Sequence, residues 1–278
     1  MEKESYKLGF DDGEYFHVME DVTIDENITD EVDSQDINLS SFKLNKELNP
    51  KIWKGEKLNP KVRLRLLDIA DEFWDGLDIS WVSPKDILLT GSISNYNWSK
   101  YSDIDLHILV DFNKVDEKVD FVKEFFDSKT KIWNDVHETL KIYGFNVEIY
   151  VQDIKEEHTS SGIYSVSKDK WLIKPNKDES SSIGLNKYSI KEKSSKYMNK
   201  IDSLFDEFEE TSDMYEIEEI SKKVKMLYDR IKALRKDGLG KDGEMSDGNI
   251  IFKVLRRSGY LEKLIDLKAL TYDKIMSL

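Results

Sequence analysis

The sequence of 278 residues contains no cysteine, which excludes disulfide bonds, thiolate metal ligands and cysteine nucleophiles. It also lacks any run of about 18 apolar residues, the length that a membrane-spanning helix needs. Residues 1–21 contain no apolar stretch of the kind found in a secretion signal. Together these absences predict a cytoplasmic protein that does not bind a membrane.

Negative charge is concentrated at the start of the chain. Residues 1–40 hold 13 Asp and Glu against two Lys, which accounts for 11 of the 14 net negative charges. A segment this acidic, with few large apolar residues, cannot offset the entropy lost on ordering, so we expect a mobile arm. The arm is either a solvated tail or a docking segment for a basic protein partner. In the second case its anchors would be the apolar residues Phe10, Tyr15, Phe16 and Val18.

The middle of the chain alternates helical and strand-like patterns. In chain order the patterns predict a helix at 58–77, strands at 86–90 and 103–110, a helix at 121–144 and a strand at 145–151. The first helix would begin with Asn59 as its N-cap and Pro60 in its first turn. The second would end at Gly144 as a C-cap. This order is typical of a sheet of mixed strands flanked by helices.

Asp103 and Asp105 stand two residues apart at the start of a strand-like run. A strand has a period of two, so both carboxylates point to one side, while the apolar residues between and after them point to the other. Two ionised carboxylates at this spacing repel each other unless a cation or a shared proton relieves them. The apolar side therefore resembles a core face, and the acidic side resembles a metal site.

Glu148 interrupts the apolar alternation of the strand at 145–151. It either faces water or, if this strand lies beside the 103–110 strand, joins Asp103 and Asp105 as a third convergent carboxylate. Three carboxylates suit two magnesium ions, because magnesium prefers oxygen ligands and is often completed by substrate phosphates. Two such ions can clamp the attacking and leaving oxygens of a phosphoryl transfer. His107 shares the face of Asp105, and we interpret it as a hydrogen-bonded imidazole.

Gly91 and Ser92 follow the apolar strand at 86–90, and ten residues separate Ser92 from Asp103. A glycine lets the backbone N–H groups of a loop approach a phosphate closely, and a serine hydroxyl adds a donor. Alone, a Gly-Ser turn is weak support for a site. Its spacing to the Asp-Ile-Asp-Leu run and to Glu148 makes the combination specific.

Gly91-Ser92 followed after ten residues by Asp103-Ile-Asp105-Leu resembles the motif of the nucleotidyltransferase superfamily typified by DNA polymerase β. The resemblance covers about residues 58–152. It implies a nucleotidyltransferase-like α+β fold, and a Gly-Ser loop that binds a nucleoside triphosphate. It further implies two magnesium ions on Asp103 and Asp105, with Glu148 as a third acid that binds metal or accepts the proton of the acceptor hydroxyl.

The resemblance does not identify the acceptor, which could be RNA, protein or a small molecule. No helix-hairpin-helix repeat accompanies the motif, which disfavours a DNA repair polymerase, and no Arg-Arg-Asp motif points to a CCA-adding enzyme. A short core followed by helices looks more like aminoglycoside-type, toxin-type or other small-acceptor nucleotidyltransferases. The chain also resembles, more weakly, nucleotidyltransferase-like proteins of large tailed phages, which would place it in the host cytoplasm or the virion.

The chain changes character after residue 152. Residues 161–175 read as a hairpin or edge strand, and 176–186 form a polar, serine-rich linker. Two amphipathic helices follow, with apolar residues recurring at helical spacing from Ile201 to Phe208 and from Ile217 to Leu234.

A basic group lies on a further helix that Ser246 or Asp247 would cap. Lys253, Arg256 and Arg257 fall on a common side of that helix. They are either a solvated face or a phosphate-binding patch opposite Asp103. The glycine-rich segment 238–248 before them could act as a lid.

These patterns predict four parts: an acidic arm at 1–40, a nucleotidyltransferase core at 41–175, a linker at 176–186 and a helical domain at 187–278. The predicted activity moves a nucleoside monophosphate from a triphosphate to a hydroxyl, with release of pyrophosphate. The alternative is a binding or structural module with the same fold, such as a phage particle component, that docks through its acidic arm.

Overall fold

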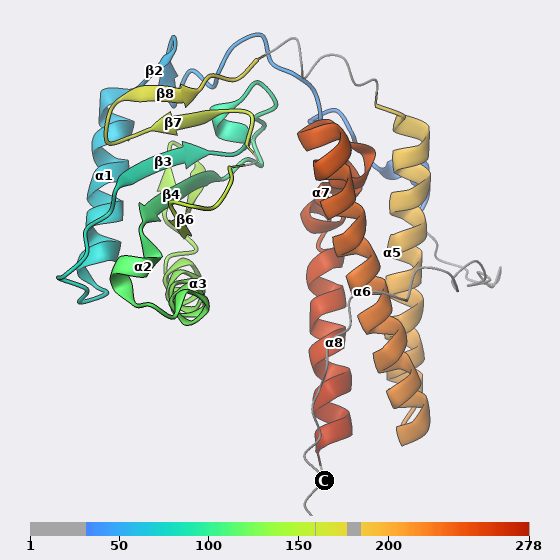
Figure 1. Ribbon diagram of the computed structural model, residues 1–278. Helices are drawn as coiled ribbons and strands as arrows, with labels where there is room; N and C mark the ends of the chain where they lie inside the picture. Colours follow the sequence, from blue (N-terminus) through green and yellow to red (C-terminus); the bar gives the residue numbers. More distant parts are fainter. Residues whose placement is uncertain (1–31, 159, 177–184, 278) are drawn as a thin grey trace, which may run out of the picture. The chain divides into compact units, whose positions relative to one another are not determined.

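The computed structural model describes residues 32–158, 160–176 and 185–277 (Figure 1). The chain from Val32 onward forms one unit. Six strands of this part form a mixed sheet in the order β5-β6-β4-β3-β7-β8. Their bounds are β3 (Asp86–Thr90), β4 (Ile104–Val110), β5 (Lys141–Ile142), β6 (Phe145–Asp153), β7 (Ile163–Ser165) and β8 (Lys170–Ile173). Strands β4 and β6 run parallel, and the other neighbouring strands are antiparallel. The mixed sheet expected from the sequence is therefore confirmed.

Helix α1 (Pro60–Asp75) begins where the sequence predicts. The Asn59 side chain accepts a hydrogen bond from the Lys61 N–H, and Pro60 occupies the first turn, where its missing N–H costs nothing. Short elements precede and follow this helix, namely η1 (Ser34–Asp36), β1 (Trp53–Lys54), β2 (Lys57–Leu58), η2 (Ser92–Ser94) and α2 (Phe112–Val115). The predicted hairpin in 161–175 is present as the antiparallel pair β7 and β8.

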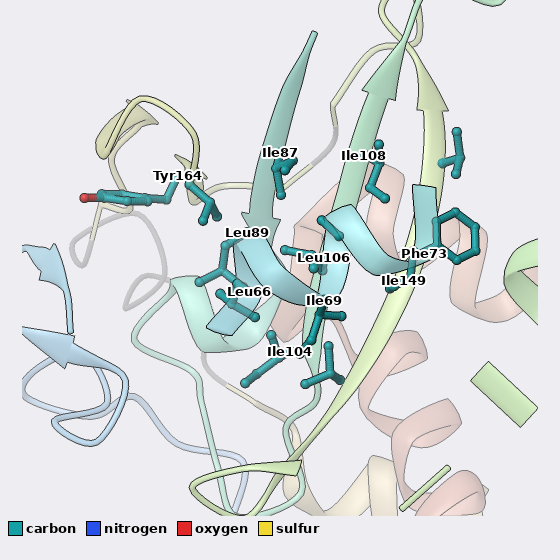
Figure 2. Close-up of a cluster of buried hydrophobic side chains, with 14 of the residues drawn as sticks. Leu66, Ile69, Phe73, Ile87, Leu89, Ile104, Leu106, Ile108, Ile149 and Tyr164 are labelled. Carbon is teal, nitrogen blue, oxygen red and sulfur yellow. The ribbon is translucent and has the colours of Figure 1, made fainter. Parts of the chain in front are cut away.

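One face of the sheet carries the hydrophobic core. Leu66, Ile69 and Phe73 of α1 point toward the labelled side chains of β3, β4 and β6 in Figure 2. The residues of β4 alternate between fully buried and partly exposed, as a strand with one core face must. Since Ile104 and Leu106 point into the core, Asp105 points to the opposite face.

Helix α3 (Val119–Val136) is shorter than the sequence predicted. It ends at Val136, whereas Gly144 lies in the turn between β5 and β6. Tyr143 and Gly144 both have positive φ, 51° and 93°, as a two-residue hairpin turn requires. The predicted C-cap was wrong because a glycine that adopts positive φ fits a hairpin turn as well as a helix end, and here β5 pairs with β6.

Four helices form the second part of the described chain, which has its own hydrophobic cluster. They are α5 (Lys187–Glu210), α6 (Met214–Asp242), α7 (Asp247–Arg257) and α8 (Tyr260–Met276). Ser246 caps α7 by accepting a hydrogen bond from the Asn249 N–H. Gly238 and Gly240 lie inside α6, which is followed by η3 (Gly243–Met245), so the glycine-rich lid considered from the sequence is helical over its first half.

The beginning of the described chain packs with these helices. Ile37, Leu39 and Phe42 are buried in the same hydrophobic cluster as α5–α8. The Val32 N–H donates a hydrogen bond to Asn199 Oδ1 at 2.8 Å. The acidic arm predicted for residues 1–40 includes this segment, and its described residues are held by these contacts. The proposed anchors Phe10, Tyr15, Phe16 and Val18 lie outside the described residues, as does most of the predicted linker.

No helix in the part of the chain that the structure describes is both long enough and apolar enough to cross a membrane.

Candidate functional site

Parallel pairing of β4 with β6 brings three carboxylates together. In the register of this pair Asp105 stands beside Glu148, and neighbouring strands lie about 4.8 Å apart. Asp103 immediately precedes β4 and shares the side of Asp105. All three line a cavity of about 190 Å³ on the face of the sheet opposite the core. The strand arrangement on which the sequence interpretation of Glu148 depended is therefore present.

The loop after β3 approaches these carboxylates closely. Thr90, the last residue of β3, pairs with Asp105, so Gly91 lies directly over it. Gly91 has φ +72° and ψ −164°, a conformation that is essentially restricted to glycine. A Cβ at this position would lie 1.8 Å from Asp105 Oδ2. The Ser92 hydroxyl shares a 2.8 Å hydrogen bond with the Ser102 hydroxyl, which ties the loop to the start of β4.

Burial and nearby negative charges raise the pKa values of the two aspartates. Burial, followed by the charges of Glu148 and Asp103, raises the pKa of Asp105 to about 8. Burial and Glu148 also raise the pKa of Asp103, although Arg256, Arg257 and Lys253 oppose the shift. Clustered acids with raised pKa values are frequent where a protein binds a cation or moves a proton.

The basic residues of α7 lie against this cavity but have different partners. Arg256 Nη2 is 3.4 Å from Asp103 Oδ2. Lys253 Nζ forms an ion pair with Glu244 Oε2 at 2.9 Å. Arg257 Nη1 donates a hydrogen bond to Ser41 Oγ at 2.9 Å. The cavity is thus lined by all eight of the candidate residues chosen from the sequence, Gly91, Ser92, Asp103, Asp105, Glu148, Lys253, Arg256 and Arg257.

Two charged residues of the cavity were missed from the sequence. The Arg235 guanidinium lies over the Phe252 ring at 4.3 Å, and its Nε has no hydrogen-bond partner among the described residues. Glu244 accepts hydrogen bonds from Asn97 and Lys253, and these partners lower its pKa although burial alone would raise it. Neither residue belongs to a recognisable motif. Arg235 and Glu244 reach the site only through contacts between segments that are separated in the sequence.

His107 has the structural role inferred from the sequence. Its Nδ1 forms a 3.1 Å hydrogen bond with Gln152 Oε1, and its ring stacks on Tyr150 with 5.0 Å between centroids. Burial lowers the pKa of His107 to about 4. At neutral pH it is therefore a neutral, hydrogen-bonded side chain beside the acids.

The donor atoms of the cavity fit divalent cations in their chemistry. The carboxylates of Asp103, Asp105 and Glu148 are the hard oxygen ligands that magnesium prefers. Burial, followed by the neighbouring negative charges, raises the pKa values of Asp103 and Asp105. No group of three or more His, Asp or Glu among the described residues is arranged to hold a metal ion. The Glu148 carboxylate instead accepts a hydrogen bond from the Tyr150 hydroxyl, and Asp103 contacts Arg256.

In a comparison with known protein families, the part of the chain that carries the acids matches a family. Residues 68–174 match the family described as a nucleotidyltransferase domain. The match runs from within α1 to the end of β8, so it contains the six-stranded sheet, the Gly91-Ser92 loop and all three carboxylates, but not α7. No curated protein and no solved structure matched the chain. The mixed sheet and the spacing of its acids agree with this match, so residues 68–174 are similar to a nucleotidyltransferase domain.

Proposed function

We propose that this chain transfers a nucleoside monophosphate from a nucleoside triphosphate to a hydroxyl acceptor and releases pyrophosphate. One observation carries the proposal: Asp103, Asp105 and Glu148 line a single cavity together with the Gly91-Ser92 loop. The family match supports nucleotidyl transfer in general. The match does not extend to the metal requirement, the nucleotide or the position of each substrate, so these are proposed as well.

The triphosphate would bind in this cavity. The backbone at Gly91 and the hydroxyl of Ser92 provide neutral donors. Arg235, Lys253 and Arg256 provide positive charge from α6 and α7, and all three line the cavity. Of these three, Arg235 gives the most direct support for a phosphate site. Its Nε has no hydrogen-bond partner among the described residues and can therefore donate to a phosphate oxygen.

Two magnesium ions would be held by Asp103, Asp105 and Glu148, where their charge would stabilise the phosphate oxygens in the transition state. The protein residues align the substrates and neutralise charge, and these effects dominate phosphoryl transfer. The acceptor oxygen forms a bond to the α-phosphorus as the bond from that phosphorus to its bridging oxygen breaks. Pyrophosphate leaves with the bonding electron pair, and the Glu148 carboxylate takes the hydroxyl proton.

Turnover tests this proposal. The protein is incubated with each labelled triphosphate, magnesium and a cell lysate, and labelled product and pyrophosphate are measured. We expect the wild type to label an acceptor, and the double variant Asp103→Ala, Asp105→Ala to be inactive. The matched control, Asp127→Ala with Asp135→Ala, removes two exposed acids of α3 and should keep wild-type activity. Equal labelling by the wild type and the Asp103, Asp105 double variant with every nucleotide would contradict the proposal.

The alternative of a purely structural module is not proposed, because no contact of the described residues favours it. A partner for the acidic arm, an origin in a phage and a location in the host cytoplasm or virion remain predictions from the sequence.

A further inference from the structure

A second cavity, of about 430 Å³, adjoins the proposed triphosphate site. The two cavities share Asp103 and Glu148, but Gly91 and Ser92 line only the first. The residues that line only the second are Lys100, Lys141, Gly144 and Asn146. A group bound there would lie next to the Glu148 carboxylate, which is proposed to accept the proton.

The lining of this second cavity carries a surplus of positive charge. Four cations line it, Lys100, Lys141, Arg256 and Arg257, against the two carboxylates of Asp103 and Glu148. Neither Lys100 nor Lys141 forms an ion pair within the described part of the chain. The two carboxylates are also the proposed metal ligands, so bound cations would increase the surplus. A ligand with several negative charges fits this cavity, whereas a polycationic one would be repelled.

An aromatic platform lies among these cations. The Tyr101 side chain is 47% exposed, with Lys100 Nζ at 4.8 Å from its ring centroid and the Arg257 guanidinium also at 4.8 Å. Across the cavity, Lys141 and Asn146 are direct partners in the β5–β6 hairpin and present an ammonium beside an amide. Cations that follow a phosphate backbone, combined with an exposed ring on which a base can stack, are how proteins bind single-stranded nucleic acid.

We propose that the second cavity is the acceptor site and that it takes the hydroxyl end of a single-stranded nucleic acid. Lys141 would contact its phosphates, and Lys100 would do so by moving off the Tyr101 ring, which frees that ring to stack on a base near the end. This inference rests on the proposed function, because it assigns the acceptor of that reaction. It differs from the small-acceptor resemblance seen in the sequence, since a polycationic aminoglycoside would face four positive side chains.

Binding without turnover tests the inference separately from catalysis. The probe is a fluorescein-labelled single strand of about 12 nucleotides, as RNA and as DNA, measured by anisotropy without triphosphate at several salt concentrations. For Lys100→Glu with Lys141→Glu we expect affinity to fall about tenfold or more. The slope of log affinity against log salt should shrink by about 1.4, which is about 0.7 for each lost phosphate contact. The matched control, Lys54→Glu with Lys131→Glu, changes exposed lysines outside both cavities and should bind as the wild type does.

Transfer assays supply the second readout. The wild type should label the 3′ end of the strand in preference to an aminoglycoside or a protein. The Lys100, Lys141 variant should raise the KM for the strand and leave the KM for the triphosphate within about twofold, because neither lysine lines the first cavity. Equal strand binding by this variant and its control, or transfer mainly to an aminoglycoside or a protein, would overturn the inference. Strand binding that needs the two lysines, in a protein that transfers nothing, would count against the proposed function and support the strand site.

Discussion

Replacing Asp105 with asparagine is expected to reduce nucleotidyl transfer about a thousandfold and to raise the thermal midpoint of the metal-free protein. The two effects have one cause. Asp105 is buried beside Glu148 and near Asp103, so ionising it costs free energy in the metal-free fold, while the proposed reaction requires the ionised carboxylate. A midpoint increase of about 2–4 °C corresponds to about 1 kcal/mol gained by replacing this buried ionisable group with a neutral one in a chain of this size.

The stabilising effect of Asp105→Asn should depend on pH. The pKa of Asp105 is raised from 3.8 to about 8 in the folded protein. Between these values the native state binds a proton that the unfolded state has lost, so the stability that Asp105 contributes is present below about pH 4 and is lost as the pH rises through about 8. Thermal unfolding in EDTA from pH 4 to 8 measures this, with Asp135→Asn on α3 as the control. Equal pH slopes for the wild type and Asp105→Asn would show that the carboxylates do not converge as described.

Replacing Gly91 with alanine is expected to abolish transfer and to destabilise the fold. The backbone of Gly91 has φ +72°, and the added Cβ would meet Asp105 Oδ2 at 1.8 Å. The strained backbone alone costs about 1–3 kcal/mol, and the clash must displace either the loop or the carboxylate. Both the transfer rate and the free energy of unfolding in urea should fall.

Gly55→Ala is the matched control for this substitution. Gly55 also has a positive φ, +64°, but an added Cβ would meet no atom within 4 Å. It should lower stability by the cost of its positive φ alone and leave transfer at the wild-type rate. If Gly91→Ala lost stability but kept its rate, the loop would not belong to the active site.

The parts of the fold that depend on local chemistry were predictable from the sequence. Asn59 and Pro60 mark the start of α1 because a cap and a proline act within one turn. The alternation in β4 placed Asp103 and Asp105 opposite the core because a strand has a period of two. The pairing of Asp105 with Glu148 could be stated only as a condition, since no local signal fixes which strands become neighbours.

The remaining features depend on contacts between distant segments. The sequence predicts a helix end at Gly144, because no local signal reveals that β5 pairs with β6. Arg235 looked like an ordinary position on α6, and only the packing of α7 places Phe252 under its guanidinium. The acidic composition around Ile37 and Leu39 predicts a mobile segment, and no local signal indicates that these side chains become buried. Their burial holds the segment against the helices.

The central claim is that Asp103, Asp105 and Glu148 act together to bind divalent cations beside a triphosphate. Counting the Mn²⁺ ions bound per chain by calorimetry, with a non-hydrolysable triphosphate analogue present, tests it most directly. We predict about two ions for the wild type and none above background for the folded Asp103→Ala, Asp105→Ala variant. The same Mn²⁺ stoichiometry and affinity in both proteins would contradict the claim.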